Sequence, residues 1–258
     1  MELIRPIVRV GNSAGVILPR EWLNGKAKIQ LVARPLDVKK EVFEILEDYL
    51  QDIIGIYLVG SYAREEQTDE SDVDVLVITN NTNKVIERGK YYITLVSKDK
   101  VESSIVNGIL PLLPMIKEAK PLLNGELIEK YKDTSLTRKN LDWHIEGTKS
   151  ILKVVRAEID LDNELNSKCR DSVAYPLVLR LREIYIVDCL KKGKLWSNKE
   201  LLRIIKKIAG SLKAYEGYLR VKNNRPLKEY LSIEEAEKLY NYVYSKIREQ
   251  EKWVKIGK

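Results

Sequence analysis

The chain has 258 residues, of which 44% are hydrophobic and 32% are charged, and its formal net charge is +7 at pH 7. This composition indicates a soluble globular protein with an apolar core, and no apolar run approaches the length that spans a membrane. Two cysteines and a single histidine exclude the usual zinc sites. Because the N-terminal segment has no signal-peptide core, we expect a cytoplasmic protein in which Cys169 and Cys189 are reduced core residues.

The first 35 residues are predicted to form a separate small unit of short strands. Apolar residues at 7–10 and 16–18 flank the turn Gly11-Asn12-Ser13, a helical turn follows at 21–23, and a further strand is predicted over 29–33. A unit of this length cannot bury a core alone. We therefore expect it to dimerise by exchanging strands with a second copy of the chain.

The stretch VRVGNSAGVILPREWL resembles the swapped-hairpin DNA-binding fold of the AbrB and MazE families. The resemblance implies two interlocked chains whose basic residues meet DNA, and the matching residues here are Arg5, Arg9 and Arg20. Two roles stay open, DNA binding and dimerisation alone. Dimerisation is favoured, because only a few arginines are available and no basic arm follows them.

The next segment contains the stretch that organises the chain. An amphipathic helix is predicted over 36–51, with Asp37 as its N-cap. A strand then ends at Gly60-Ser61, and a second strand opens with Asp72 and Asp74. Residues two apart on a strand point to the same face, so these carboxylates can together hold Mg²⁺ or Mn²⁺. The glycine and serine offer backbone N–H groups and a hydroxyl to a phosphate.

The pattern Gly-Ser, ten intervening residues, Asp-x-Asp resembles the nucleotidyltransferases of the DNA polymerase beta superfamily. In its local form, GSYAREE followed by SDVDVLV, it most resembles the minimal nucleotidyltransferases of bacteria and archaea. The resemblance implies that Asp72 and Asp74 are the catalytic and metal-binding residues, and that Gly60, Ser61 and Arg64 bind the nucleotide. The family often has glycine after this arginine, whereas this chain has a glutamate.

A third strand is predicted over 91–97, followed by helices over 99–107 and 110–120. Active members of the superfamily commonly carry a third carboxylate on this strand. Thr94 stands where that carboxylate is expected, and Asp99 is the nearest acid downstream with Glu102 after it. Without a third acid the usual group that takes the proton of the attacking hydroxyl is missing. The resemblance therefore supports nucleotide binding more firmly than transfer.

From Ser135 onward the hydrophobic spacing predicts four or five helices with short connections, which is typical of an antiparallel bundle. The predicted helices span 135–159, 171–192, 197–209, 212–222 and 232–253, the last opening with the capping box Ser232–Glu235. This half resembles the helical domains that accompany minimal nucleotidyltransferases, including the HEPN class. His144 lacks the arginine–histidine motif of HEPN ribonucleases, so we expect no ribonuclease activity. A basic run that includes Tyr215 and Tyr218 is either a solvated face or a polyanion-facing side of the active cleft.

The predicted fold class is therefore α+β with three parts. They are a swapped-hairpin β module over 1–35, a mixed-sheet α/β nucleotidyltransferase domain over 36–132, and an antiparallel helical bundle over 133–258. The predicted function is Mg-dependent transfer of a nucleoside monophosphate from a nucleoside triphosphate, with ATP the expected donor, to a protein, a small molecule or an RNA end. The alternatives are a DNA-binding, antitoxin-like or transcriptional regulator with a nucleotide-sensing core, and a nucleotide-binding scaffold paired with a toxin. The expected partners are a nucleotide and a second copy of the chain, and no membrane.

Overall fold

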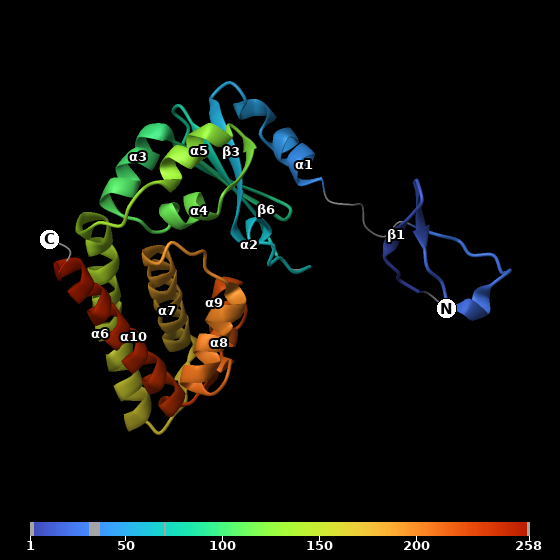
Figure 1. The fold of residues 1–258 in the computed structure, drawn as a ribbon. Coiled ribbons are helices and arrows are strands. Elements are labelled where there is room, and N and C mark those ends of the chain that lie inside the picture. Colours follow the sequence, from blue (N-terminus) through green and yellow to red (C-terminus); the bar gives the residue numbers. More distant parts are fainter. Residues whose placement is uncertain (1–2, 31–36, 70, 257–258) are drawn as a thin grey trace. The chain divides into compact units, whose positions relative to one another are not determined.

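The computed structural model describes residues 3–30, 37–69 and 71–256. The chain divides into two compact units, one ending at Asp37 and one beginning at Val38, and each is described by itself (Figure 1). None of the helices in the described ranges is long and apolar enough to cross a membrane.

The first unit contains the predicted hairpin. Strands β1 (Ile7–Val10) and β2 (Ser13–Val16) pair antiparallel, and Gly11 takes a positive φ of 58° in the turn between them. A helical turn, η1 (Arg20–Trp22), follows. The predicted strand over 29–33 is not formed at residues 29 and 30, and its remainder lies outside the described residues. No side chain of β1, β2 or η1 is buried.

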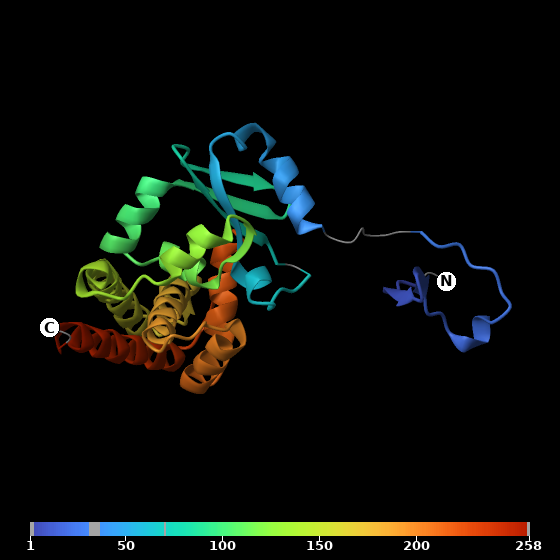
Figure 2. The same ribbon diagram turned by 45° about the horizontal axis from the view of Figure 1, so that its top comes forward.

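The second unit is built on a mixed five-stranded sheet with the order β5-β6-β4-β3-β7 (Figure 2). Its strands are β3 (Ile53–Val59), β4 (Val73–Thr79), β5 (Lys84–Arg88), β6 (Tyr91–Ser97) and β7 (Lys120–Leu123). Strands β4 and β6 run parallel, and the other neighbours run antiparallel. Strand β4 is buried from Val75 to Thr79, as expected for an apolar strand that is covered on both faces.

Helices cover this sheet. The predicted helix over 36–51 is shorter, comprising α1 (Val38–Ile45) and the turn η2 (Glu47–Tyr49), and α2 (Gly60–Ala63) is a single turn after β3. Helices α3 (Lys98–Asn107), α4 (Leu112–Glu118) and α5 (Gly125–Lys132) lie together on one face (Figure 1). Alternate residues of β4, Leu76 and Ile78, share a buried core with apolar residues of these three helices.

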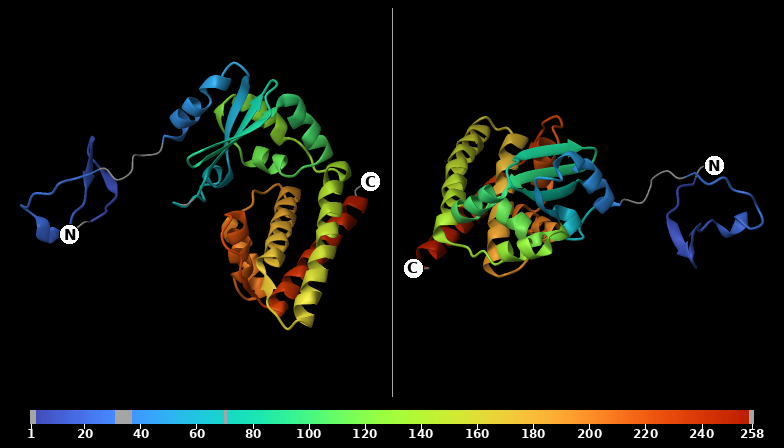
Figure 3. Two further views of the ribbon diagram at one scale, coloured as in Figure 1. Left: turned by 180° about the vertical axis from the view of Figure 1, so that it is seen from behind. Right: turned by 90° about the horizontal axis from the view of Figure 1, so that it is seen from above.

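The rest of the unit is helical, as the sequence predicts (Figure 3). Its helices are α6 (Arg138–Glu164), α7 (Asp171–Lys191), α8 (Asn198–Ala209), α9 (Lys213–Lys222) and α10 (Ile233–Ile256), and the short strands β8 (Cys169–Arg170) and β9 (Glu229–Leu231) pair beside them. The predicted capping box forms, since the backbone N–H of Ser232 and the backbone N–H of Glu235 each donate to the other residue's side chain. Both cysteines are free, and only Cys169 is buried.

Candidate active site

The two predicted carboxylates lie at the start of β4. Asp72 is exposed, immediately before the strand, and Asp74 is half-buried as its second residue. The backbone N–H of Val73 donates to the carbonyl of Lys90 at 2.8 Å, which fixes the beginning of the strand beside the turn that leads into β6. Asp74 pairs with Val59, the last residue of β3. The structure therefore brings together the strand end that carries Gly60 and the strand start that carries both aspartates.

Gly60 follows β3 with a φ of +70°. A Cβ atom at this position would lie 2.2 Å from Oδ2 of Asp74, far inside contact distance. Only glycine can therefore combine this backbone conformation with so close an approach of the carboxylate. Ser61, half-buried in the single turn of α2, stands directly after it. The Gly-Ser turn and Asp74 thus form one contiguous site.

A buried carboxylate that the sequence analysis missed supports this turn. Glu118, at the end of α4, accepts a hydrogen bond of 2.7 Å from the backbone N–H of Gly60. Its other oxygen accepts from Nη1 of Arg64. Burial raises the pKa of Glu118, and the Arg64 guanidinium opposes that rise. Glu118 has no sequence signal of its own, because it ends an ordinary apolar helix and meets the turn only in the folded chain.

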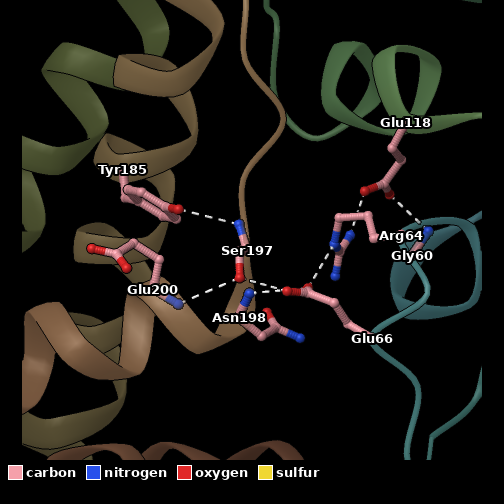
Figure 4. A network of polar contacts seen from close by, with 8 residues as sticks. All are labelled: Gly60, Arg64, Glu66, Glu118, Tyr185, Ser197, Asn198 and Glu200. Atoms are coloured by element: carbon pink, nitrogen blue, oxygen red, sulfur yellow. Dashed lines mark hydrogen bonds and ion pairs between the residues drawn. The ribbon is translucent and has the colours of Figure 1, made fainter.

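The side chain of Arg64 is buried next to the site. Its side chain is 6% exposed and sits between two carboxylates, Glu118 and Glu66, with Nε donating to Oε2 of Glu66 at 3.1 Å (Figure 4). The predicted role of Arg64 is direct contact with phosphate. In the structure the guanidinium of Arg64 contacts Glu118 and Glu66, and Glu118 in turn accepts the hydrogen bond from Gly60.

Glu65, the residue after Arg64, has an unusual backbone conformation. The backbone φ of Glu65 is +60°, in the left-handed region that residues other than glycine rarely adopt. Its carboxylate lies on the surface, where it accepts a hydrogen bond of 2.6 Å from Nζ of Lys120. A glutamate at position 65 therefore strains the backbone of this turn.

The adjacent Glu66 links the site to the helical region. Its Oε1 accepts from Oγ of Ser197 at 2.5 Å, and its Oε2 accepts from the backbone N–H of Asn198 at 3.0 Å, both at the N-terminus of α8. The backbone N–H of Ser197 in turn donates to the hydroxyl of Tyr185 in α7 at 3.1 Å (Figure 4). Polar contacts thus run without a break from Gly60 through Arg64 to the helices.

Two cations of the helical region act on Asp74. Burial raises the pKa of Asp74 to about 6, and the positive charges of Lys222 in α9 and Arg182 in α7 counteract this rise. Nη1 of Arg182 donates to the hydroxyl of Tyr218 at 3.4 Å. Tyr218 stacks on Tyr175, with ring centroids 5.4 Å apart. Lys222 belongs to the basic stretch that the sequence predicts around Tyr215 and Tyr218. No pattern in the sequence marks Arg182 as a residue of the site.

Strand β6 carries no acidic residue, and Tyr92 rather than Thr94 is paired with Asp74. In the parallel register Asp74 pairs with Tyr92, and Thr94 pairs with Leu76, one pleat further from the site. Asp99 belongs to the first turn of α3, beyond the opposite end of β6. Thr94 is therefore not directly beside Asp74, and the alternative that Asp99 reaches back is wrong, because β6 extends to Ser97. Within the described residues no group of three or more acidic, histidine or cysteine side chains could hold a metal.

The remaining predicted residues lie elsewhere. Arg5, Arg9 and Arg20 are exposed on the first unit, where Nε of Arg9 donates to the carbonyl of Gly11 at 3.0 Å. His144 is buried in α6, and its Nε2 lies 3.1 Å from Oε1 of Gln250. This contact gives the histidine a structural role between α6 and α10.

Comparison with known proteins agrees with the site. Residues 39–161 match the model of the nucleotidyltransferase domain family. The solved structures that are similar to the chain include the following two. One is a nucleotidyltransferase-like protein from Exiguobacterium sibiricum, with 14% identity, a TM-score of 0.38, and coverage of 82% of this chain and 75% of that one. The other is spectinomycin adenyltransferase AAD(9) from Enterococcus faecialis, with 15% identity, a TM-score of 0.42, and coverage of 81% and 97%. No curated protein matches the chain significantly. Residues 39–161, which carry Gly60, Asp72 and Asp74, are thus similar to a nucleotidyltransferase domain, and this match supports transfer of a nucleotide as the class of reaction.

Proposed function

We propose that the chain transfers a nucleoside monophosphate from a nucleoside triphosphate, with ATP the expected donor, to an acceptor hydroxyl. The observation that carries this proposal is the close approach of Asp74 to the Gly60 turn, inside the segment that matches the nucleotidyltransferase domain. Asp72 stands two residues before it, immediately ahead of the strand. Arg182 and Lys222 supply positive charge from the helical region.

The two aspartates fit a divalent cation. Mg²⁺ or Mn²⁺ is commonly bound by one or two carboxylates and takes its remaining ligands from water and substrate phosphates, so a site without a third acid is sufficient. Once bound, the ion would neutralise the polyphosphate and polarise the phosphorus that is attacked. Asp72 and Asp74 would hold it at the edge of the sheet.

Other residues of the chain have separate tasks. Glu118 already occupies the N–H of Gly60, so the hydroxyl of Ser61 is the group of this turn that is placed to meet a phosphate. Arg182 and Lys222 would offset the charge of the triphosphate and of the leaving pyrophosphate. Glu66, through its contacts with Ser197 and Asn198, would keep the sheet and these helices in register.

Calorimetric titration with ATP, GTP, CTP and UTP in the presence of Mg²⁺ tests the proposal. We expect one nucleotide to bind the wild-type chain, and the double substitution Asp72→Asn/Asp74→Asn to abolish binding. Asp69→Asn, an exposed residue of the same connection, is the matched control and should bind normally. If no nucleotide binds the wild type, the proposed function is wrong.

We also propose that the first unit pairs with a second copy of the chain. Its apolar side chains favour this reading, since Ile4, Ile17 and Leu23 are 81%, 71% and 69% exposed. Strand exchange would bury these side chains, as the resemblance to AbrB and MazE implies. Separately, the helical region would be an antiparallel bundle of the kind that accompanies minimal nucleotidyltransferases. Sedimentation of the full chain should give a dimer that Ile17→Asp dissociates. A monomeric wild type would contradict the pairing.

DNA binding by this unit is the alternative role. An operator shift assay with the full chain tests it, because Arg9→Ala should weaken a specific complex and the complex should weaken as salt is raised. Normal nucleotide binding together with no DNA shift would leave dimerisation as the role of the unit.

A further inference from the structure

A tyrosine is paired with Asp74 on the neighbouring strand. Tyr92 pairs with Asp74 in the parallel register of β4 and β6. Paired residues of neighbouring strands project from the same face, and neighbouring strands are about 4.8 Å apart. The side chain of Tyr92 is 42% exposed. Tyr92 is therefore accessible to solvent on the strand next to the carboxylate that would bind the metal.

A carboxylate lies on the other side of this tyrosine. Glu87, on the edge strand β5, pairs with Tyr92 in an antiparallel register and is exposed. Directly opposite residues of antiparallel strands are close enough for their side chains to interact. Asp74, Tyr92 and Glu87 thus form a row across three strands. Glu87 is two strands away from Asp74, which places it beside the phenol rather than beside a shared metal.

We propose that the hydroxyl of Tyr92 is itself an acceptor, so that the chain attaches a nucleoside monophosphate to its own tyrosine. This inference rests on the proposed function. The phenolic oxygen forms a bond to the α-phosphorus of the nucleotide, and the bond between that phosphorus and the α–β bridging oxygen breaks. Pyrophosphate leaves with the electron pair, and the phenolic proton passes to Glu87 and then to water. The product is a phosphodiester between Tyr92 and the nucleoside, formed without any change of oxidation state.

The row of side chains accounts for the absence of a third acid on β6. An acid next to Asp74 would serve an acceptor that arrives from solution. With a phenol in that place, the protein itself provides the acceptor hydroxyl, and the neighbouring Glu87 acts as the base. Because each chain has one Tyr92, the reaction stops at one nucleotide per chain.

Intact mass measurement of the full chain after incubation with the nucleotide that it binds, and with Mg²⁺, tests the inference. We expect the mass of one nucleoside monophosphate to be added, and peptide mapping to place it on Tyr92. Tyr92→Phe should abolish the adduct. Tyr91→Phe is the matched control and should retain it, because Tyr91 is 5% exposed and its hydroxyl donates to Glu41 at 3.0 Å.

The role of Glu87 is tested by rate. Glu87→Gln should slow formation of the adduct by about 100-fold, the size of effect expected of a proton acceptor, while the adduct stays on Tyr92. An unchanged rate would remove Glu87 from the reaction. Nucleotide binding without any adduct, or an adduct on another residue, would overturn the inference and leave the proposed function standing. If no nucleotide binds, both are wrong.

Discussion

Removing the charge of Arg64 should destabilise the protein more than any exposed ion pair could. The side chains of Arg64 and Glu118 are 6% and 5% exposed. Arg64→Met would leave Glu118 buried with the backbone N–H of Gly60 as its remaining donor. Loss of one partner from a buried pair costs about 3–5 kcal/mol of the free energy of unfolding. Glu118→Gln should cost less, about 1–3 kcal/mol, because Arg64 keeps its contact with Glu66.

The double variant separates charge from packing. Arg64→Met/Glu118→Gln removes the buried charge of residue 118 while losing the Glu66 pair as Arg64→Met does, so we expect it to be more stable than Arg64→Met alone by roughly 1–3 kcal/mol. Urea unfolding of the full chain, followed by circular dichroism, measures all three variants. Arg203→Met, which breaks an exposed pair with Glu200, is the control and should cost less than about 1 kcal/mol.

The pH dependence of the same variant gives an independent check. Burial already raises the pKa of Glu118, and loss of Arg64 would raise it further. A carboxyl group whose folded pKa is raised destabilises the fold when it ionises, so the cost of Arg64→Met should be smaller at pH 5 than at pH 8. A cost that is flat or larger at pH 5, or a double variant no more stable than Arg64→Met, would refute the reasoning.

Three further substitutions test the geometry. Gly60→Ala should abolish nucleotide binding in calorimetry, because its Cβ would meet Asp74 at 2.2 Å, and normal binding would contradict the described turn. Glu65→Gly and Glu65→Ala both lose the surface ion pair with Lys120. We expect the glycine variant to be more stable in urea unfolding by about 1 kcal/mol, because glycine adopts the left-handed backbone conformation without strain. Equal stabilities of the two variants would argue against strain at this position. Asp171→Asn should cost about 1–3 kcal/mol at pH 7. The hydrogen bond from Arg220 lowers the pKa of Asp171. The stability that this pair contributes is therefore present above the ordinary pKa of an aspartate and is lost as the pH falls through the lowered pKa. If Asp171→Asn costs as much in acid as at pH 7, the pair is not the source of the cost.

The sequence predicted the parts of the site that follow from local periodicity. Alternation along β4 placed Asp72 and Asp74 at the start of a strand, and the glycine placed the turn after β3. Hydrophobic spacing also predicted α7 and α8.

What the sequence could not predict depends on contacts between distant segments. The residue beside Asp74 is set by the register of β6, which the β5 hairpin fixes, and a single strand does not reveal its own register. The same register pairs Thr94 with Leu76. Glu118, Glu66 and Arg182 meet the site from other elements, and no pattern around them indicates which partner they will find.

The apolar core of the helical region continues into the part of the chain before it. Ile109 and Leu113 are fully buried in the same cluster as residues of α6, α7 and α10. A chain cut at residue 132 would expose both of them to water, so the sheet and the helices after it should melt in one transition rather than two. The aspartates and the cations that face them then lose their arrangement at a single temperature, and a homologue could exchange its helices only by rebuilding this shared core.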